Sequence, residues 1–235
     1  MFRSLATTVC LAIAAVVLAV ATAEAAPVSP VYIYGNLGTV NATSTSNTVG
    51  YLSLAQPNQF QAQGFSVGNQ VGSSAWDIQE IQVGLGASGS PSPVVAIYSD
   101  FASINGPVPG TPLATFTGTS AVSAKGIYTF TGSFTALQNT SYWVVLANGN
   151  SASLESYEWY TNDAFTTPTQ QNASNVNYLG TSERNDVAGS WTNAIPSLSI
   201  SVSAVAVPEP PTYALAMVAG VLGAGAAARR RSKKA

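Results

Sequence analysis

The residues with the most potential for chemistry stand together at positions 155–163, in the run Glu-Ser-Tyr-Glu-Trp-Tyr-Thr-Asn-Asp. A glycoside hydrolase needs two carboxylates, and Glu158 and Asp163 are the candidate pair in this run. Aromatic rings beside acids and amides also suit contact with sugars. The candidate carbohydrate contacts are Tyr157, Trp159 and Tyr160.

A β-strand over residues 156–160 would divide these side chains between two faces. Glu158 and Tyr160 would share one face, and Tyr157 and Trp159 would share the other. On this interpretation Tyr157 and Trp159 pack in a hydrophobic core. Core packing, carbohydrate contact and catalysis are therefore alternative roles for the segment.

Composition excludes several kinds of catalysis. The sequence contains no histidine, and its one cysteine, Cys10, precedes the region expected to fold. Ser-His-Asp and Cys-His catalysis and imidazole-bound zinc are thereby excluded, and no Walker or dinucleotide motif is present. We predict a protein that is not an enzyme and has no catalytic residues, no metal site and no cofactor.

Calcium is the one cofactor alternative left open. Side-chain oxygens in expected loops suit calcium, but no contiguous calcium-binding loop motif occurs. The candidate ligands are Asp100, Asn105, Asn162, Asp163 and Asp186.

The charge of the central region disfavours nucleic-acid binding. Between Pro27 and Val207 the basic residues are Lys125 and Arg184 alone, against eight acidic residues, a net charge of −6. A protein that binds nucleic acid presents a basic surface to the phosphates. We therefore expect no nucleic-acid partner.

Residues 26–206 carry the period-two alternation of β-strands and no strong helical period. We predict eight to ten strands in an all-β domain, an antiparallel β-sandwich or jelly-roll-like fold, beginning near residues 61–67. The alternating apolar positions include Ile81, Val83 and Leu85, Tyr142, Val144 and Leu146, and Leu198, Ile200, Val202 and Val205.

Turn residues predict where the strands end. Loops are expected at residues 86–91, 105–110 and 147–150, with Pro109-Gly110 as a turn pair. Asp100 is expected to begin a loop. Residues 142–146 predict a central strand, with an edge strand or an outward Trp143 as the alternative.

The N-terminal residues 1–25 read as a signal peptide. Arg3 supplies the positive charge, residues 5–20 are apolar, and Ala23 and Ala25 fit the small-x-small cleavage rule. The prolines at 27 and 30 argue against an uncleaved anchor. We predict cleavage after Ala25 and export of the chain.

The C-terminal residues 207–235 contain three consecutive parts. The proline-fixed motif is Val207, Pro208, Glu209 and Pro210. The apolar run 213–228 predicts a transmembrane helix about 24 Å long, slightly short for the ~30 Å hydrocarbon core. A basic cluster at 229–234 then stops transfer and stays cytoplasmic. Its members are Arg229, Arg230, Arg231, Lys233 and Lys234.

These three parts, in this order, resemble the PEP-CTERM sorting signal. The resemblance implies an exosortase, a membrane-embedded cysteine transpeptidase, as the partner that recognises Pro208, Glu209 and Pro210 and cleaves the tail. It further implies the secretion machinery and the inner membrane as partners, with exopolysaccharide as a candidate partner. A plain tail anchor with a proline linker is the alternative.

The central region resembles the choice-of-anchor R domain, a β-rich extracellular domain. The resemblance rests on residues 34–37, 62–65, 77–85, 95–100, 109–113 and 139–146, taken in order. It implies no catalytic residues.

The sequence thus predicts an exported, non-enzymatic protein, anchored outside the inner membrane and then placed at the cell surface or in a biofilm or exopolysaccharide matrix. A carbohydrate-binding module for exopolysaccharide is the first alternative. A carboxylate-dependent glycoside hydrolase is the second.

Overall fold

The computed structural model describes residues 29–37, 46–50, 59–68, 73–87, 92–118, 121–149, 156–161, 169–170, 176–185, 189–194 and 197–208. The expected signal peptide and everything after Pro208 lie outside these ranges. The strands form one compact unit, Ser29–Pro208. Within the described ranges no helix has the length and apolarity needed to cross a membrane.

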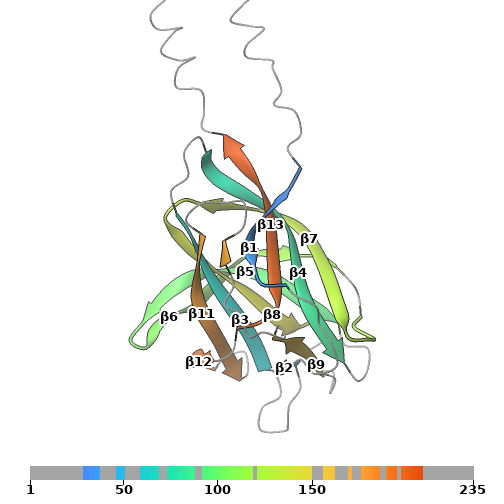
Figure 1. The fold of residues 1–235 in the computed structure, drawn as a ribbon. Coiled ribbons are helices and arrows are strands. Elements are labelled where there is room, and N and C mark those ends of the chain that lie inside the picture. Colours follow the sequence, from blue (N-terminus) through green and yellow to red (C-terminus); the bar gives the residue numbers. More distant parts are fainter. Residues whose placement is uncertain are drawn as a thin grey trace, which may run out of the picture. The chain divides into compact units, whose positions relative to one another are not determined.

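Thirteen strands make up the described chain, and every pairing between them is antiparallel (Figure 1). They are β1 (Val31–Gly35), β2 (Ser46–Gly50), β3 (Gln59–Val67), β4 (Ser73–Ala87), β5 (Pro93–Ser103), β6 (Gly106–Phe116), β7 (Gly126–Leu137), β8 (Thr140–Asn148), β9 (Ser156–Tyr160), β10 (Thr169–Gln170), β11 (Val176–Asn185), β12 (Thr192–Ala194) and β13 (Ile200–Pro208). The predicted all-β class is confirmed. The strands begin earlier than the predicted residues 61–67, because β1 and β2 precede β3. The other strands beyond the predicted eight to ten include short pieces such as β10 and β12, which hold too few residues to show alternation.

The strands form two antiparallel sheets, consistent with a β-sandwich. One sheet has the order β10-β1-β13-β4-β7, and the other has the order β12-β11-β3-β8-β5-β6. At one end β9 pairs with β4 and with β2, and β2 pairs with β3, so the β9–β2 pair joins the two sheets. A bridge between Thr117 and Thr131 also joins the end of β6 to β7.

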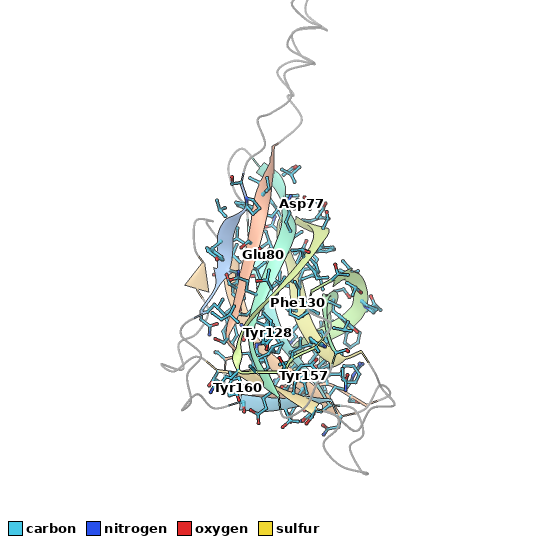
Figure 2. All side chains as sticks on the ribbon, turned by 90° about the vertical axis from the view of Figure 1, so that its right-hand side faces the viewer. Asp77, Glu80, Tyr128, Phe130, Tyr157 and Tyr160 are labelled. Carbon is cyan, nitrogen blue, oxygen red and sulfur yellow. The ribbon has the colours of Figure 1, made fainter. Side chains whose placement is uncertain are left out.

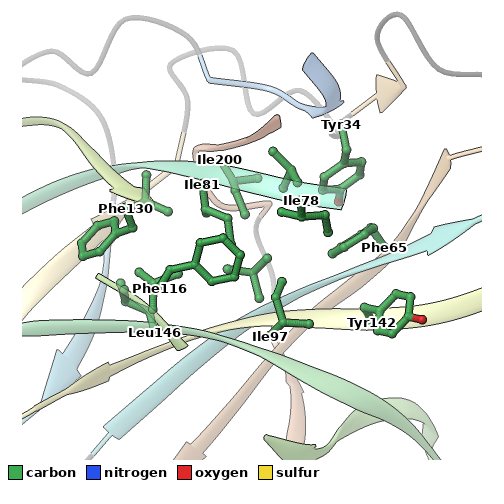
Figure 3. Packing of buried hydrophobic residues seen from close by; sticks show 14 of the residues in the cluster. Tyr34, Phe65, Ile78, Ile81, Ile97, Phe116, Phe130, Tyr142, Leu146 and Ile200 are labelled. Atoms are coloured by element: carbon green, nitrogen blue, oxygen red, sulfur yellow. The ribbon is translucent and has the colours of Figure 1, made fainter. Parts of the chain in front are cut away.

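The main core lies between the two sheets and receives side chains from both. Ile78, Ile81 and Ile200 come from one sheet, and Phe65 and Tyr142 come from the other (Figure 3). The alternation read from the sequence is confirmed in β4, β8 and most of β13. In β13 the last fully buried residue is Ala204, and Ala206 still packs against the main core, while Val205 is only half-buried.

A β-bulge in β4 reverses which side chains face the core. The pairing of β4 with both neighbours shifts between Ile78 and Glu80. Trp76 and Ile78 are buried before the bulge, and Ile81, Val83 and Leu85 are buried after it. One extra residue in a strand moves every later side chain to the opposite face. The bulge therefore explains why the buried residues have even numbers before it and odd numbers after it.

The hairpin of β5 and β6 corrects two sequence predictions. Asp100 does not begin a loop, because β5 continues to Ser103, and the Pro109-Gly110 pair lies inside β6. The turn falls at residues 104–105 instead. Among the described residues β6 pairs along its length with β5 alone, and an edge strand tolerates proline because one row of its N–H groups has no strand partner. Its three prolines, at 107, 109 and 112, therefore fit a strand.

Two further expected loops begin later than predicted. Residues 86–87 still belong to β4, and residues 147–148 still belong to β8. Residues 88–91 lie outside the described ranges. Gly86 therefore does not by itself end a strand.

Candidate functional site

The aromatic segment at β9 divides between core and surface as its alternation predicts. Tyr157 and Trp159 are completely buried. The Tyr157 hydroxyl donates to the Ala147 carbonyl, and Trp159 Nε1 donates to the Ser199 carbonyl at 2.9 Å. The proposed carbohydrate contact of Tyr157 and Trp159 is therefore wrong, and their core alternative is correct.

Tyr160 lies on the other face of β9 with Glu158, at the end of the unit where Tyr157 also lies (Figure 2). Its hydroxyl donates to Glu158 Oε2, and Lys125 Nζ sits 3.8 Å from the centre of its ring. Burial, followed by the hydrogen bond and the charge of Glu158, raises the pKa of Tyr160 to about 12. A Cβ on Gly86 would approach the ring to 2.7 Å, so the ring also packs against the β4 backbone.

This arrangement includes one carboxylate of the catalytic alternative, Glu158. Glu158 already accepts a hydrogen bond, and Lys125 already covers the Tyr160 ring. Asp163, the other carboxylate of the expected pair, lies outside the described residues. What the geometry supports is a link between β9 and the segment that precedes β7.

A second group of aromatic residues lies on the outer face of β3, β8 and β5. Its buried members are Ala62, Trp143 and Val145, with Phe60, Tyr98 and Trp191 packed against them; we call these six residues the outer cluster. The predicted central strand is confirmed, but Trp143 has the outward orientation that was given as the alternative. It stands in a central strand between β3 and β5, and it points away from the main core.

The hairpin arm, residues 100–109, covers this outer face. Asp100 Oδ1 accepts a hydrogen bond from Trp143 Nε1 at 2.8 Å, and the Asn105 carbonyl accepts one from Asn193 Nδ2 at 2.9 Å. β6 accordingly contacts β3, β8 and β11, although β5 separates it from them in the sheet. A Cβ on Gly64 would lie 3.0 Å from the Trp143 ring, so the indole rests against the β3 backbone. The arm therefore makes Trp143 a buried residue on an outer face.

Arg184 stacks against the half-buried aromatic rings at the edge of the outer cluster. Its guanidinium carbon lies 4.5 Å from the centre of the Phe60 ring and 4.7 Å from that of Trp191. Phe60, Tyr98 and Trp191 are each half-buried. Sequence reasoning missed this group, because its members are far apart in the chain and the pairing of β3, β8 and β5 brings most of them together.

A row of polar side chains lies inside the unit on β3. Gln59, Gln61 and Gln63 are buried on the same face as Phe65. Gln59 Nε2 and Gln61 Nε2 approach Glu183 Oε2 at 3.4 and 3.3 Å, and Gln63 Oε1 accepts the Leu198 N–H at 2.7 Å. Sequence reasoning also missed this row, although the alternation of Gln with an inward Phe65 is a signal for it.

The expected calcium ligands are not gathered in the described structure. Asp100 is bound to Trp143, and the carbonyl of Asn105 is bound to Asn193. Asn162, Asp163 and Asp186 lie outside the described residues. Among the residues that are described, no three His, Cys, Asp or Glu side chains form a group.

The sorting motif begins inside the sheet. Val207 and Pro208 are the last residues of β13 and pair with Ala75 and Ser73 of β4. β1 ends its pairing with β13 at Ala204, so among the described strands β4 alone pairs with β13 at Pro208. The remaining predicted targeting residues lie outside the described ranges: Ala23, Ala25, Glu209, Pro210, Arg229, Arg230, Arg231, Lys233 and Lys234.

Comparison with known proteins gives no match to a family model, a curated protein or a solved structure. The class that the structure defines is an all-β protein of two antiparallel sheets. A function must therefore be argued from the chain's own residues.

Proposed function

We propose that this is an exported, non-enzymatic protein of the cell surface or of a biofilm or exopolysaccharide matrix. Its PEP-CTERM tail anchors it in the inner membrane until an exosortase processes it. The observation that carries the proposal is the complete tail: the motif 207–210, the apolar run 213–228 and the basic cluster 229–234, in that order.

The placement of the first and last strands supports this proposal. β1 and β13 are neighbours in one sheet, with Val31 paired to Ala204. The chain therefore enters and leaves the compact unit at adjacent strands. A jelly-roll-like sandwich, flanked by a signal-peptide helix and a transmembrane helix, is the full architecture that we propose.

Intact mass of the surface form tests the proposal. We expect a mature chain that begins at residue 26 and lacks the basic cluster in cells with the exosortase, and one that keeps this cluster in cells without it. The matched control replaces Pro208, Glu209 and Pro210 with alanine and should keep its tail in both strains. A tail that stays intact in exosortase-containing cells would remove the sorting proposal.

Carbohydrate binding is the second candidate, and the outer cluster is the observation that favours it. Phe60, Tyr98 and Trp191 present parts of three rings beside the guanidinium of Arg184 on one face. Rings and a cationic donor together suit a sugar polymer that carries hydroxyl or carboxylate groups. Of the contacts first expected, Tyr160 alone keeps a half-exposed ring.

Affinity electrophoresis through the cell's own exopolysaccharide tests this candidate. We expect Trp191→Ala to lose retardation, and Tyr32→Ala to keep it. Tyr32 is the matched control because it is a partly exposed aromatic on the other sheet. Equal mobility of the wild type with and without polysaccharide would reject this candidate but leave the sorting proposal in place. No contact among the described residues favours the hydrolase alternative.

A further inference from the structure

The sheet that contains β13, β4 and β7 carries an apolar patch at the end where β13 finishes. Val207 of β13 pairs with Ala75 of β4, and Ala75 pairs with Leu137 of β7. Directly paired residues of neighbouring strands point to the same face. Leu137 is 56% exposed, Val207 is half-buried, and Ala75 between them is 3% exposed. Val205 lies two residues before Val207 and is also half-buried. We call Ala75, Leu137, Val205 and Val207 the end patch.

The end patch lies on the outer face of this sheet, because the residues that alternate with it point inward. Trp76, Ala136 and Ala206 all pack in or against the main core. Farther along the same strands the outward positions are polar, as in the paired set Ser203, Glu80 and Thr131. A single exposed leucine is ordinary, but an apolar row across three neighbouring strands indicates a contact surface.

The sequence that follows Val207 indicates what meets the end patch. Pro208 is the last residue of β13, and the apolar run that we propose as a membrane anchor begins at Tyr213. A fully extended chain covers at most about 3.6 Å per residue, so Pro208 lies at most about 18 Å from Tyr213. A short tether gives the membrane surface a high effective concentration at the end patch, so a small apolar patch is sufficient for contact.

Charge also distinguishes this end of the sheet from the opposite end. The end patch contains no charged residue, and Asp77, one row away, accepts hydrogen bonds from Ser133 Oγ at 2.8 Å and Gln79 Nε2 at 3.1 Å. Glu158 pairs with β4 eleven residues after Ala75, which is about 36 Å along a strand. Anionic phospholipid headgroups repel carboxylates, so they favour contact with the uncharged end.

We propose that the end patch rests on the phospholipid surface of the membrane that holds the tail, with Leu137 and Val207 among the headgroups. The headgroup layer is about 5–7 Å deep, which is enough to take up these side chains. This proposal rests on the proposed anchor and adds which end of the all-β unit meets the membrane. It places the start of the sorting motif at the surface in which a membrane-embedded transpeptidase is held.

Quenching of a dye by lipids that carry a nitroxide on the headgroup tests this contact. The chain is purified from cells without exosortase, and Cys10→Ser ensures that Thr135→Cys and Thr129→Cys each take a single dye. Both threonines are exposed on β7, and Thr129 lies about 20 Å farther from the end patch. In vesicles of phosphatidylcholine and phosphatidylglycerol we expect strong quenching at residue 135 and little at residue 129. Equal quenching at the two positions would overturn the proposal.

Leu137→Asp should lower the quenching at residue 135 to the level seen at residue 129, because the headgroups repel the new carboxylate. Ile127→Asp is the matched control, since it places the same charge at another exposed apolar residue of β7, which is 50% exposed. It should leave the quenching at residue 135 unchanged. Thermal melting followed by circular dichroism checks that both variants fold. Full quenching at residue 135 in a folded Leu137→Asp chain would contradict contact through the end patch.

Two further measurements separate the membrane contact from the anchor and from self-association. A dye on Gly220→Cys, in the apolar run, should be quenched by lipids with a nitroxide on the acyl chain. Loss of that signal would remove the anchor and this proposal with it. If that signal is present while residues 135 and 129 are quenched equally, only the membrane contact is removed. Self-quenching between dyes at residue 135 of different chains, in place of quenching by lipid, would assign the end patch to a second copy and overturn the proposal.

Discussion

Trp159 and Trp143 are both fully buried, but they lie in cores of different construction. Trp159 belongs to the main core, where the inward faces of both sheets meet, and its N–H bonds to a backbone carbonyl. Trp143 belongs to the outer cluster, where one sheet face is covered by a folded-over hairpin, and its N–H bonds to the Asp100 carboxylate. Burial alone therefore does not tell how much of the fold depends on a residue.

The two cores also differ in how completely they are enclosed. The main core is enclosed by sheets on both sides, whereas the hairpin arm ends in solvent: Ile104 is 100% exposed and Phe101 is 60% exposed. Regions with few buried apolar contacts open at lower free energy than the rest of a protein. We therefore expect the arm to detach from the outer face without unfolding the sandwich.

The largest effect is expected from Trp159→Ala. Loss of this ring leaves a cavity between the sheets and removes the donor to Ser199, at a cost of about 4–5 kcal/mol of unfolding free energy. Urea denaturation measures the change. A loss below about 1 kcal/mol would show that the two sheets do not depend on their shared core.

Trp143→Ala should cost less, about 3 kcal/mol, because the arm can collapse onto the space that the ring leaves. Hydrogen exchange should increase mainly in residues 100–109 and β12, with little change in β4 and β13. Equal loss of protection in both sheets would mean that the outer cluster and the main core form one cooperative unit.

Asp100→Ala should cost about 1–3 kcal/mol, because the buried Trp143 N–H loses its acceptor. Asp100→Asn retains an oxygen acceptor and is the matched control, with a smaller expected loss. Urea denaturation of the two variants separates the hydrogen bond from the general effect of changing Asp100. Identical losses would indicate that the hydrogen bond does not hold the arm.

The smallest effect concerns the β9 surface and appears only at alkaline pH. The pKa of Tyr160 is raised from 10.0 to about 12, so its contribution to stability is complete below pH 10 and is lost as pH rises toward 12. Tyr160→Phe should therefore lose less stability than the wild type between these pH values. Some loss should remain, since burial also raises the pKa of Tyr34 and Tyr157 well above the ordinary value. Parallel urea denaturation curves at pH 8 and pH 11 measure the difference, and equal losses would contradict it.

Much of the fold could be predicted from local pattern. Period-two alternation located β4, β8 and β13 and divided the β9 side chains correctly, because the two faces of a strand meet different surroundings. Proline and glycine were less reliable indicators of where a strand ends. Pro109 and Gly110 lie in a strand because β6 is an edge, and a residue's place in a sheet is not local information.

The candidate sites were largely hidden from sequence. Phe60, Tyr98, Trp143 and Trp191 are far apart in the chain, and the outer cluster exists because the sheet places β3, β8 and β5 side by side. The burial of Gln59, Gln61 and Gln63 was not predicted, since a polar side chain in a strand usually faces solvent. Gln59 and Gln61 find a partner in Glu183, which β11 brings alongside β3, and Gln63 accepts the Leu198 N–H.

The sequence by itself determined the all-β class, the acidic and histidine-free character of the central region, and the expected targeting segments at residues 1–25 and 207–235. These depend on composition and short-range order, which folding does not alter. The tertiary structure alone decided that Trp143 is buried on an outer face, that Tyr157 and Trp159 are in the core, and that Gln59 and Gln61 meet the Glu183 carboxylate. Each of these depends on which distant strand lies alongside, because burial is a property of neighbours in space.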